Sequence, residues 1–214
     1  MKSLLNEEVS QQIKQVLDSM ENPITLVLFT QKDPCETCAE TRSLLHEVAV
    51  LNEKMTIVEK DLHTDANDAE RYGVTLTPSF VILNADGDYQ GVKFNGIPAG
   101  HEINSFLSAL VEMSGVKPDF NEAVLKRIEA IEGDVNIKVF VTLQCPHCPG
   151  AVQTAHRLAM QHGSINAEMI EAQTFPELSQ KFNVSGVPKI IINDRLELVG
   201  NQPVEAFLEQ IERL

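Results

Sequence analysis

The sequence predicts an α/β protein made of two similar halves. All four cysteines lie in two C-x-x-C pairs, CETC at 35–38 and CPHC at 145–148, which are 110 positions apart. A proline that opens an apolar run recurs at the same offset, at Pro78 and Pro188. In both halves, apolar runs of β-strand type alternate with segments of helical periodicity. A single offset shared by these landmarks indicates an internal repeat.

The two halves present the same elements in the same order. A helix over about 8–20, and again over about 120–131, precedes the apolar strands ITLVLFT and NIKVFVT. Each cysteine pair opens a second helix, CAETRSLLHEVAVLN or CPGAVQTAHRLAMQH, and the strand MTIVEKD or NAEMIEA follows. A short helix then ends near Tyr72 or Phe182, just before the proline-led strand.

Each half closes with a turn, a strand and a helix. We expect YQGVKF and LELVG to be edge strands, and EINSFLSALVEM and PVEAFLEQIERL to be amphipathic helices. Gly115 and Pro118 interrupt the helical pattern between the halves. The predicted domains are therefore 1–116, which carries CETC, and 117–214, which carries CPHC.

Charge and hydropathy exclude several classes of partner. The net charge of −14 argues against binding to nucleic acid or to an anionic membrane surface. The polar first twenty residues lack the apolar core of a secretory signal, and no apolar run is long enough for a membrane helix. We therefore expect a cytoplasmic protein, and in that compartment C-x-x-C pairs are more often catalytic or metal-binding than structural.

The cysteine spacing favours thiol–disulfide exchange. A cysteine at the N-terminus of a helix is stabilised as a thiolate by the helix dipole and by unpaired N–H groups. We therefore expect Cys35 and Cys145 to be nucleophiles and Cys38 and Cys148 to be the resolving thiols. Zinc is the alternative, but paired C-x-x-C zinc sites have roughly 12–20 intervening residues, whereas 106 residues separate Cys38 from Cys145.

Charged neighbours predict different redox properties for the two pairs. His147, between the second pair of cysteines, and Lys189, directly after Pro188, would favour the Cys145 thiolate. Glu36, with Asp33 and Glu40 nearby, would oppose ionisation of Cys35. The half-chains 1–116 and 117–214 carry −10 and −4. Because thiolate stabilisation favours the reduced state, the second site is predicted to be the better oxidant.

The order β-α-β-α-β-β-α, with C-x-x-C after the first strand, resembles the thioredoxin fold. Two further segments, GVKFNGIPAGHEINSFL (Gly91–Leu107) and VFVTLQCPHCPGAVQTAHRLA (Val139–Ala159), make the whole chain similar to the protein disulfide oxidoreductase family. The resemblance implies two tandem thioredoxin-fold domains, each with a central mixed β-sheet flanked by helices. It also implies an enzyme that reduces, oxidises or isomerises protein disulfides, with no cofactor beyond its own redox-active disulfides.

The same resemblance assigns further residues and partners. The prolines Pro78 and Pro188 would be cis and, with Thr77 and Val187, would receive an extended substrate backbone. The family commonly takes electrons from a thioredoxin-reductase-like flavoprotein. The N-terminal domain of the flavoprotein component of alkyl hydroperoxide reductase shares the double fold, so electron delivery to a peroxiredoxin is the alternative function. A zinc-holding or chaperone module is a third.

The proton acceptor for the resolving thiols is the residue that the resemblance leaves open. The position that is usually acidic, six residues before the first cysteine, holds Phe29 in one half and Val139 in the other. Glu59 and Glu171, in the strands after the active-site helices, are substitutes by pattern. Each could equally be a solvated glutamate at the end of its strand.

Overall fold

Seventeen elements follow the order that the repeat predicts within the part of the chain described by the computed structural model, residues 4–32 and 34–214. The first half contains α1 (Glu7–Leu17), β1 (Ile24–Thr30), α2 (Cys38–Ala49), β2 (Met55–Asp61), α3 (Ala66–Arg71), β3 (Ser79–Leu83), β4 (Tyr89–Asn95), the 3-10 helix η1 (Gly100–Glu102) and α4 (Ile103–Met113). The second half contains α5 (Glu122–Glu129), β5 (Val135–Val141), α6 (Cys148–Gln161), β6 (Ile165–Glu171), α7 (Pro176–Lys181), β7 (Lys189–Ile192), β8 (Leu196–Val199) and α8 (Val204–Ile211). None of the described helices has both the length and the apolar character needed to cross a membrane.

One mixed sheet of eight strands runs through both halves in the order β2-β1-β3-β4-β6-β5-β7-β8. Each half contributes four strands in the same relative order, which confirms the predicted α/β architecture. The two predicted sheets are joined because β4 pairs in parallel with β6, from Val92 opposite Ala167 to Asn95 opposite Ile170. The predicted boundary after residue 116 lies in the segment between α4 and α5.

The expectation that YQGVKF forms an edge strand is wrong, because β4 lies in the middle of the sheet. Gly91 explains the difference. Its φ is +75°, and a Cβ at this position would collide with the carbonyl oxygen of Ile165 and lie 3.2 Å from the Cα of Asn166. The missing side chain therefore lets the second half approach β4 closely. LELVG does supply an edge strand, β8.

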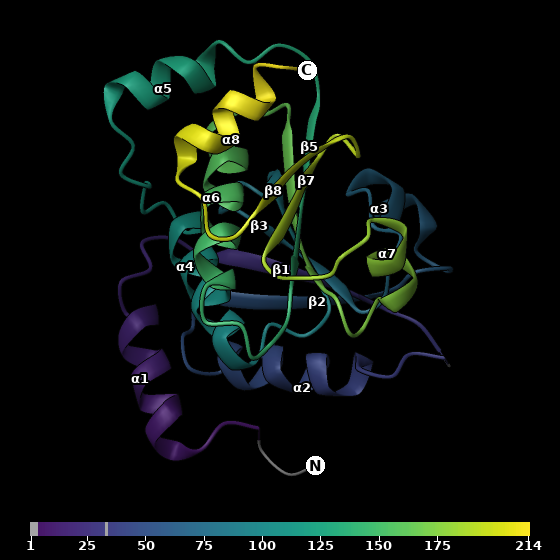
Figure 1. Ribbon diagram of the computed structural model, residues 1–214. Coiled ribbons are helices and arrows are strands. Elements are labelled where there is room, and N and C mark those ends of the chain that lie inside the picture. The colour runs from purple at the N-terminus through teal and green to yellow at the C-terminus, as the bar shows by residue number, and fades with distance from the viewer. Residues whose placement is uncertain (1–3, 33) are drawn as a thin grey trace.

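Alternating strand residues separate the two faces of the sheet. On one face, Leu28, Phe94 and Val139 belong to the main core, which α4 and α6 help to cover. On the other face, smaller apolar clusters lie against α3 and α7, which Figure 1 shows on the side of the sheet opposite α4 and α6. Asn6 and Asn121 cap α1 and α5 by accepting a hydrogen bond from a first-turn N–H.

A buried polar network crosses the β4–β6 junction on the α3/α7 face. Ser79 Oγ donates to Asn95 Oδ1 at 2.6 Å, and Asn95 Nδ2 donates to Glu168 Oε2 at 2.8 Å. The ammonium of Lys93 lies 3.6 Å from the same carboxylate oxygen. Because a buried polar group is costly unless it is paired, this network helps to fix how the two halves meet.

Candidate redox sites

The first cysteine pair closes a disulfide between Cys35 and Cys38, with their Cα atoms 5.5 Å apart. Cys38 is the first residue of α2 and is buried, whereas Cys35 is half-buried in the preceding loop. Glu36 is exposed between them. Asp33, which entered the charge argument, lies outside the described residues. The arrangement places the less buried sulfur where a second protein can reach it.

The second pair closes a disulfide between Cys145 and Cys148, also with a Cα separation of 5.5 Å. Cys148 begins α6 and is fully buried, and Pro149 follows in the first turn, where its missing N–H costs no helix hydrogen bond. Cys145 Sγ lies 3.8 Å from the carbonyl oxygen of Val187. The loop before the second repeated proline, Pro188, therefore lies directly against the disulfide.

Both proline peptide bonds are cis, Thr77–Pro78 and Val187–Pro188, as the family resemblance implied. The carbonyl oxygen of Pro78 accepts a hydrogen bond from Gly96 at 2.9 Å, and that of Pro188 accepts one from Gly200 at 2.9 Å. These matching bonds tie each proline loop to the residue that ends the neighbouring strand. The assignment of Thr77 and Val187 to substrate binding stays a prediction.

Lys189 does not point its charge at the second disulfide. Its ammonium donates to the carbonyl oxygens of Phe182 at 2.8 Å and Asn183 at 3.2 Å, and it pairs with Glu197 at 3.1 Å. Lys189 alternates with Ile190, which packs in the core that contains both cysteines of the second pair. The lysine therefore faces the opposite side of the sheet from the cysteines, and its part in the charge argument is corrected.

His147 is an exposed residue at the N-cap position of α6, and its side chain makes no capping hydrogen bond. It lies between the two cysteines of the second pair in the chain. Its predicted effect on the Cys145 thiolate stays a prediction.

The two glutamates considered as proton acceptors have other partners. The exposed carboxylate of Glu59 pairs with Arg42 at 2.8 Å and with His46 Nε2 at 2.9 Å. Glu171 is buried, but its Oε2 accepts the N–H of Thr174 at 2.6 Å and the hydroxyl of Thr174 at 2.7 Å. Glu171 thus shapes the loop between β6 and α7.

The strand positions chosen by counting back from the cysteines are not equivalent. Phe29 pairs with Ser79, whereas the residue that pairs with the matching Lys189 is Phe140, so the first strands are offset by 111 positions. The residue that corresponds to Val139 is therefore Leu28, and both lie in the main core. The loop before Cys35 has one residue more than its counterpart, which the fixed cysteine offset concealed.

Glu102 is a buried titratable residue that the sequence pattern did not reveal. It lies at the end of η1, and η1 packs against α6. The N–H of His101 also donates to the carbonyl oxygen of Leu143, two residues before Cys145. Burial raises the pKa of Glu102 to about 7, although a hydrogen bond from Ser105 works against the shift. Glu102 Oε1 is buried without a hydrogen-bond partner among the described residues. A first-half carboxyl is thereby placed on the segment that borders the second site.

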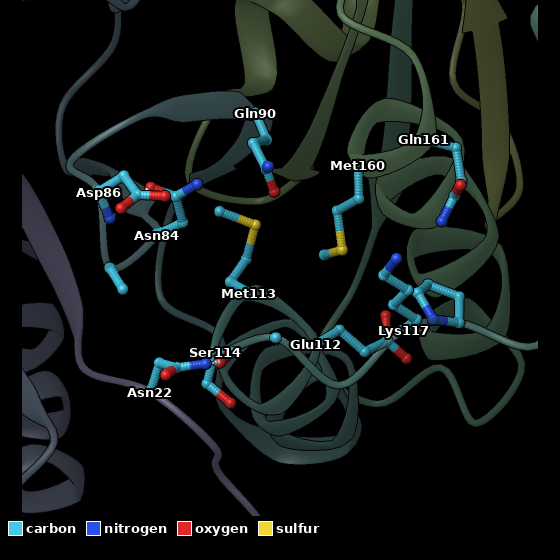
Figure 2. Close-up of a pocket in the computed structure, with 13 residues that line it drawn as sticks. Asn22, Asn84, Asp86, Gln90, Glu112, Met113, Ser114, Lys117, Met160 and Gln161 are labelled. Atoms are coloured by element: carbon cyan, nitrogen blue, oxygen red, sulfur yellow. Dashed lines mark hydrogen bonds between the residues drawn. The ribbon is translucent and has the colours of Figure 1, made fainter.

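The hollow in Figure 2, of about 340 Å³, lies away from both disulfides. Asn84 and Asp86 line it from the turn after β3, at the end of that strand remote from Pro78. Met113 and Met160 extend into it from the ends of α4 and α6 (Figure 2). It contains none of the predicted site residues. Within residues 4–32 and 34–214, no three His, Cys, Asp or Glu side chains are grouped to hold a metal ion.

Two C-x-x-C disulfides at helix starts, each accompanied by a cis proline, define a double thioredoxin-fold protein with two disulfide centres. A thioredoxin-domain family matches residues 135–213. The N-terminal domain of the alkyl hydroperoxide reductase AhpF from Enterococcus faecalis is 30% identical, with a TM-score of 0.91 over 97% of this chain and 99% of that one. A protein disulfide oxidoreductase from Aeropyrum pernix is 28% identical, with a TM-score of 0.88 over 97% and 92%.

The corresponding alkyl hydroperoxide reductase protein of Staphylococcus aureus is 30% identical over 97% of this chain. The chain spans 38% of the length of that relative. With the relatives above, this places the chain in the thioredoxin-fold thiol–disulfide oxidoreductase family.

Proposed function

We propose that the protein reduces, oxidises or isomerises disulfides of other proteins through Cys35/Cys38 and Cys145/Cys148. The observation that carries the proposal is the closure of each pair into its own disulfide at the start of a helix, with a cis proline in the same half. A helix N-terminus stabilises the thiolate of the reduced form. The chemistry requires no group beyond the cysteines themselves.

The exchange proceeds in two displacements. In the reductive direction, the thiolate of Cys35 or Cys145 attacks one sulfur of a substrate disulfide, and the other substrate sulfur leaves as a thiolate. The thiolate of Cys38 or Cys148 then attacks the enzyme sulfur of the mixed disulfide, which releases the second substrate thiolate and closes the enzyme disulfide. Two electrons pass from enzyme to substrate, and a thioredoxin-reductase-like flavoprotein would restore the dithiol.

At the second site, Glu102 is our candidate proton acceptor for the resolving thiol of Cys148. A carboxyl group whose pKa lies near 7 can accept and release a proton at neutral pH. Its location on η1, which packs on the helix that begins with Cys148, supports this assignment. Glu171 is less suited to the role because its Oε2 is already bound by the β6–α7 loop.

The turbidimetric reduction of insulin by dithiothreitol tests the proposed activity. Wild-type protein should accelerate insulin precipitation, and the variants Cys35→Ser and Cys145→Ser should each retain the contribution of the other site. The doubly substituted protein should fall to the uncatalysed rate. A wild-type rate in the double variant would refute catalysis by these cysteines.

Electron delivery to a peroxiredoxin is a second candidate, favoured by the match of nearly the whole chain to the N-terminal domain of the alkyl hydroperoxide reductase AhpF. Here the protein would pass electrons from a flavoprotein reductase to one peroxiredoxin. Fast reduction of a peroxiredoxin disulfide combined with slow insulin turnover would favour this function. Comparable rates on insulin and on unrelated protein disulfides would favour the broader one.

A further inference from the structure

A groove of about 900 Å³ opens beside the first disulfide and is bounded by both halves of the chain. The first half contributes Cys35 and the segment Thr75–Thr77, which precedes the cis proline. The facing wall comes from the second half, from the loop after β6 and from α7, and includes Phe175 and Leu178. The nucleophile therefore lies in a channel rather than on an open surface.

The wall is held firmly against the first site. Glu171 binds Thr174 through both its backbone N–H and its hydroxyl, which fixes the start of the loop. Gly96 lies so close to this loop that a Cβ there would approach the Cβ of Glu171 to 2.7 Å. The N–H of Gly96 also donates to the carbonyl oxygen of Pro78. One short path of contacts thus links the cis proline of the first site to the second-half wall.

The strand order explains why the first site has this wall. The first half ends its sheet with β4, which pairs with β6, so the loop after β6 lies next to the first proline loop. The corresponding strand of the second half, β8, is the edge of the sheet. Gly200, which matches Gly96 in bonding to its proline, would bring a Cβ near only Gln202. The repeat therefore gives the two sites different surroundings.

The lining of the groove indicates what it accepts. Phe175 and Leu178 offer apolar surface, while the carboxylates of Glu36 and Glu177 outnumber the single ammonium of the lining, that of Lys181. Among the hydrogen bonds of the described residues, none uses the backbone N–H groups at positions 76 and 77. Those amides can pair with the backbone of an extended segment, as in strand addition.

We propose that this groove binds an extended polypeptide segment that carries the substrate cysteine, with an apolar residue against Phe175 and Leu178 and a basic residue near Glu36 and Glu177. The proposal rests on the proposed thiol–disulfide exchange and adds the substrate class of the first site. The second site, which lacks the wall, does not select for this charge pattern.

The test uses protein with only the first site active, Cys145→Ser/Cys148→Ser, reduced with dithiothreitol and then desalted. Two peptides differ only in a Lys or a Glu beside one cysteine, which is held as a mixed disulfide with 5-thio-2-nitrobenzoate. The Cys35 thiolate attacks the peptide sulfur and releases the coloured aromatic thiolate. The Cys38 thiolate then displaces the peptide thiolate and closes the enzyme disulfide, so two electrons leave the enzyme dithiol.

The Lys peptide should react about three to five times faster than the Glu peptide, the effect expected of one or two exposed charge pairs. High salt should reduce the ratio. Glu177→Lys should abolish or reverse the preference. Glu53→Lys, the same charge change at an exposed turn outside the groove lining, should leave it intact. Protein with only the second site, Cys35→Ser/Cys38→Ser, should show no preference.

Reduction of neutral hydroxyethyl disulfide separates the two levels of the proposal. If the first-site protein reduces it but treats both peptides alike, or keeps its preference after Glu177→Lys, the groove assignment is overturned and the exchange activity stands. If hydroxyethyl disulfide is not reduced at all, the proposed function of the first site fails, and the groove assignment fails with it.

Discussion

Replacing Glu102 with Gln should change how the stability of the protein depends on pH. The carboxyl is fully buried, and its pKa is raised from 4.5 to about 7 in the folded state. Between these two values the folded protein holds a proton that the unfolded chain releases. Stability from this group therefore falls as pH rises from about 4.5 to 7, and the loss is complete above pH 7.

The size of the effect follows from the shift. At 1.36 kcal/mol for each pKa unit, the ionised carboxylate costs the folded state about 3 kcal/mol. Gln keeps the shape of the side chain and can still meet Ser105, but it carries no charge. Glu102→Gln should therefore gain about 3 kcal/mol over the wild type between about pH 4 and pH 8.

Urea unfolding of the disulfide-bonded protein at several pH values measures this gain. The exposed Glu53→Gln serves as the matched control, and its difference from the wild type should stay nearly constant with pH. A Glu102→Gln difference that is equally constant would refute the raised pKa and, with it, the reason for choosing Glu102 as proton acceptor.

Other changes should have equally specific effects. His156→Gln should remove a loss of stability of about 3 kcal/mol that the wild type suffers as pH falls from 6.5 to 4 in urea titrations, because burial lowers the pKa of His156 to about 4; an unchanged acid limb would contradict this. Lys189→Met should cost about 1–3 kcal/mol, since the carbonyl oxygens of Phe182 and Asn183 lose their donor, yet leave the second-site reduction potential unshifted, and a clear fall in that potential would restore the original charge argument. Glu171→Ala should slow peptide reduction at the first site several-fold while hydroxyethyl disulfide reduction stays normal, and a loss confined to the second site would argue against its part in the groove wall.

The repeat in the sequence was enough to predict the fold and to locate both cysteine pairs. Local patterns determine these features, since the strands, the helix starts and the prolines recur in the same order in each half. What the sequence did not reveal was the joining of the sheets. YQGVKF alternates like an edge strand, and only the approach of Ile165 shows why Gly91 stands in a central strand.

The surroundings of the sites were harder to predict because they depend on contacts between the halves. Lys189 follows a cis proline in sequence, but strand alternation turns its ammonium away from Cys145. Glu102 has the pattern of an ordinary polar residue at a helix start, and its burial becomes visible only once η1 packs against α6. A single added residue in the loop before Cys35 also misaligned the strand positions.

The reduction potential of each cysteine pair tests the central claim most directly. The variants Cys35→Ser/Cys38→Ser and Cys145→Ser/Cys148→Ser would be equilibrated in defined dithiothreitol buffers, and their free thiols counted by alkylation and mass measurement. We expect each remaining pair to titrate as a two-electron couple, about 30 mV for each tenfold change in the redox ratio, with the Cys145/Cys148 pair the more oxidising. A pair that stays reduced or oxidised throughout would not be a redox site, and if neither pair titrated, the assignment of the protein as a thiol–disulfide oxidoreductase would be contradicted.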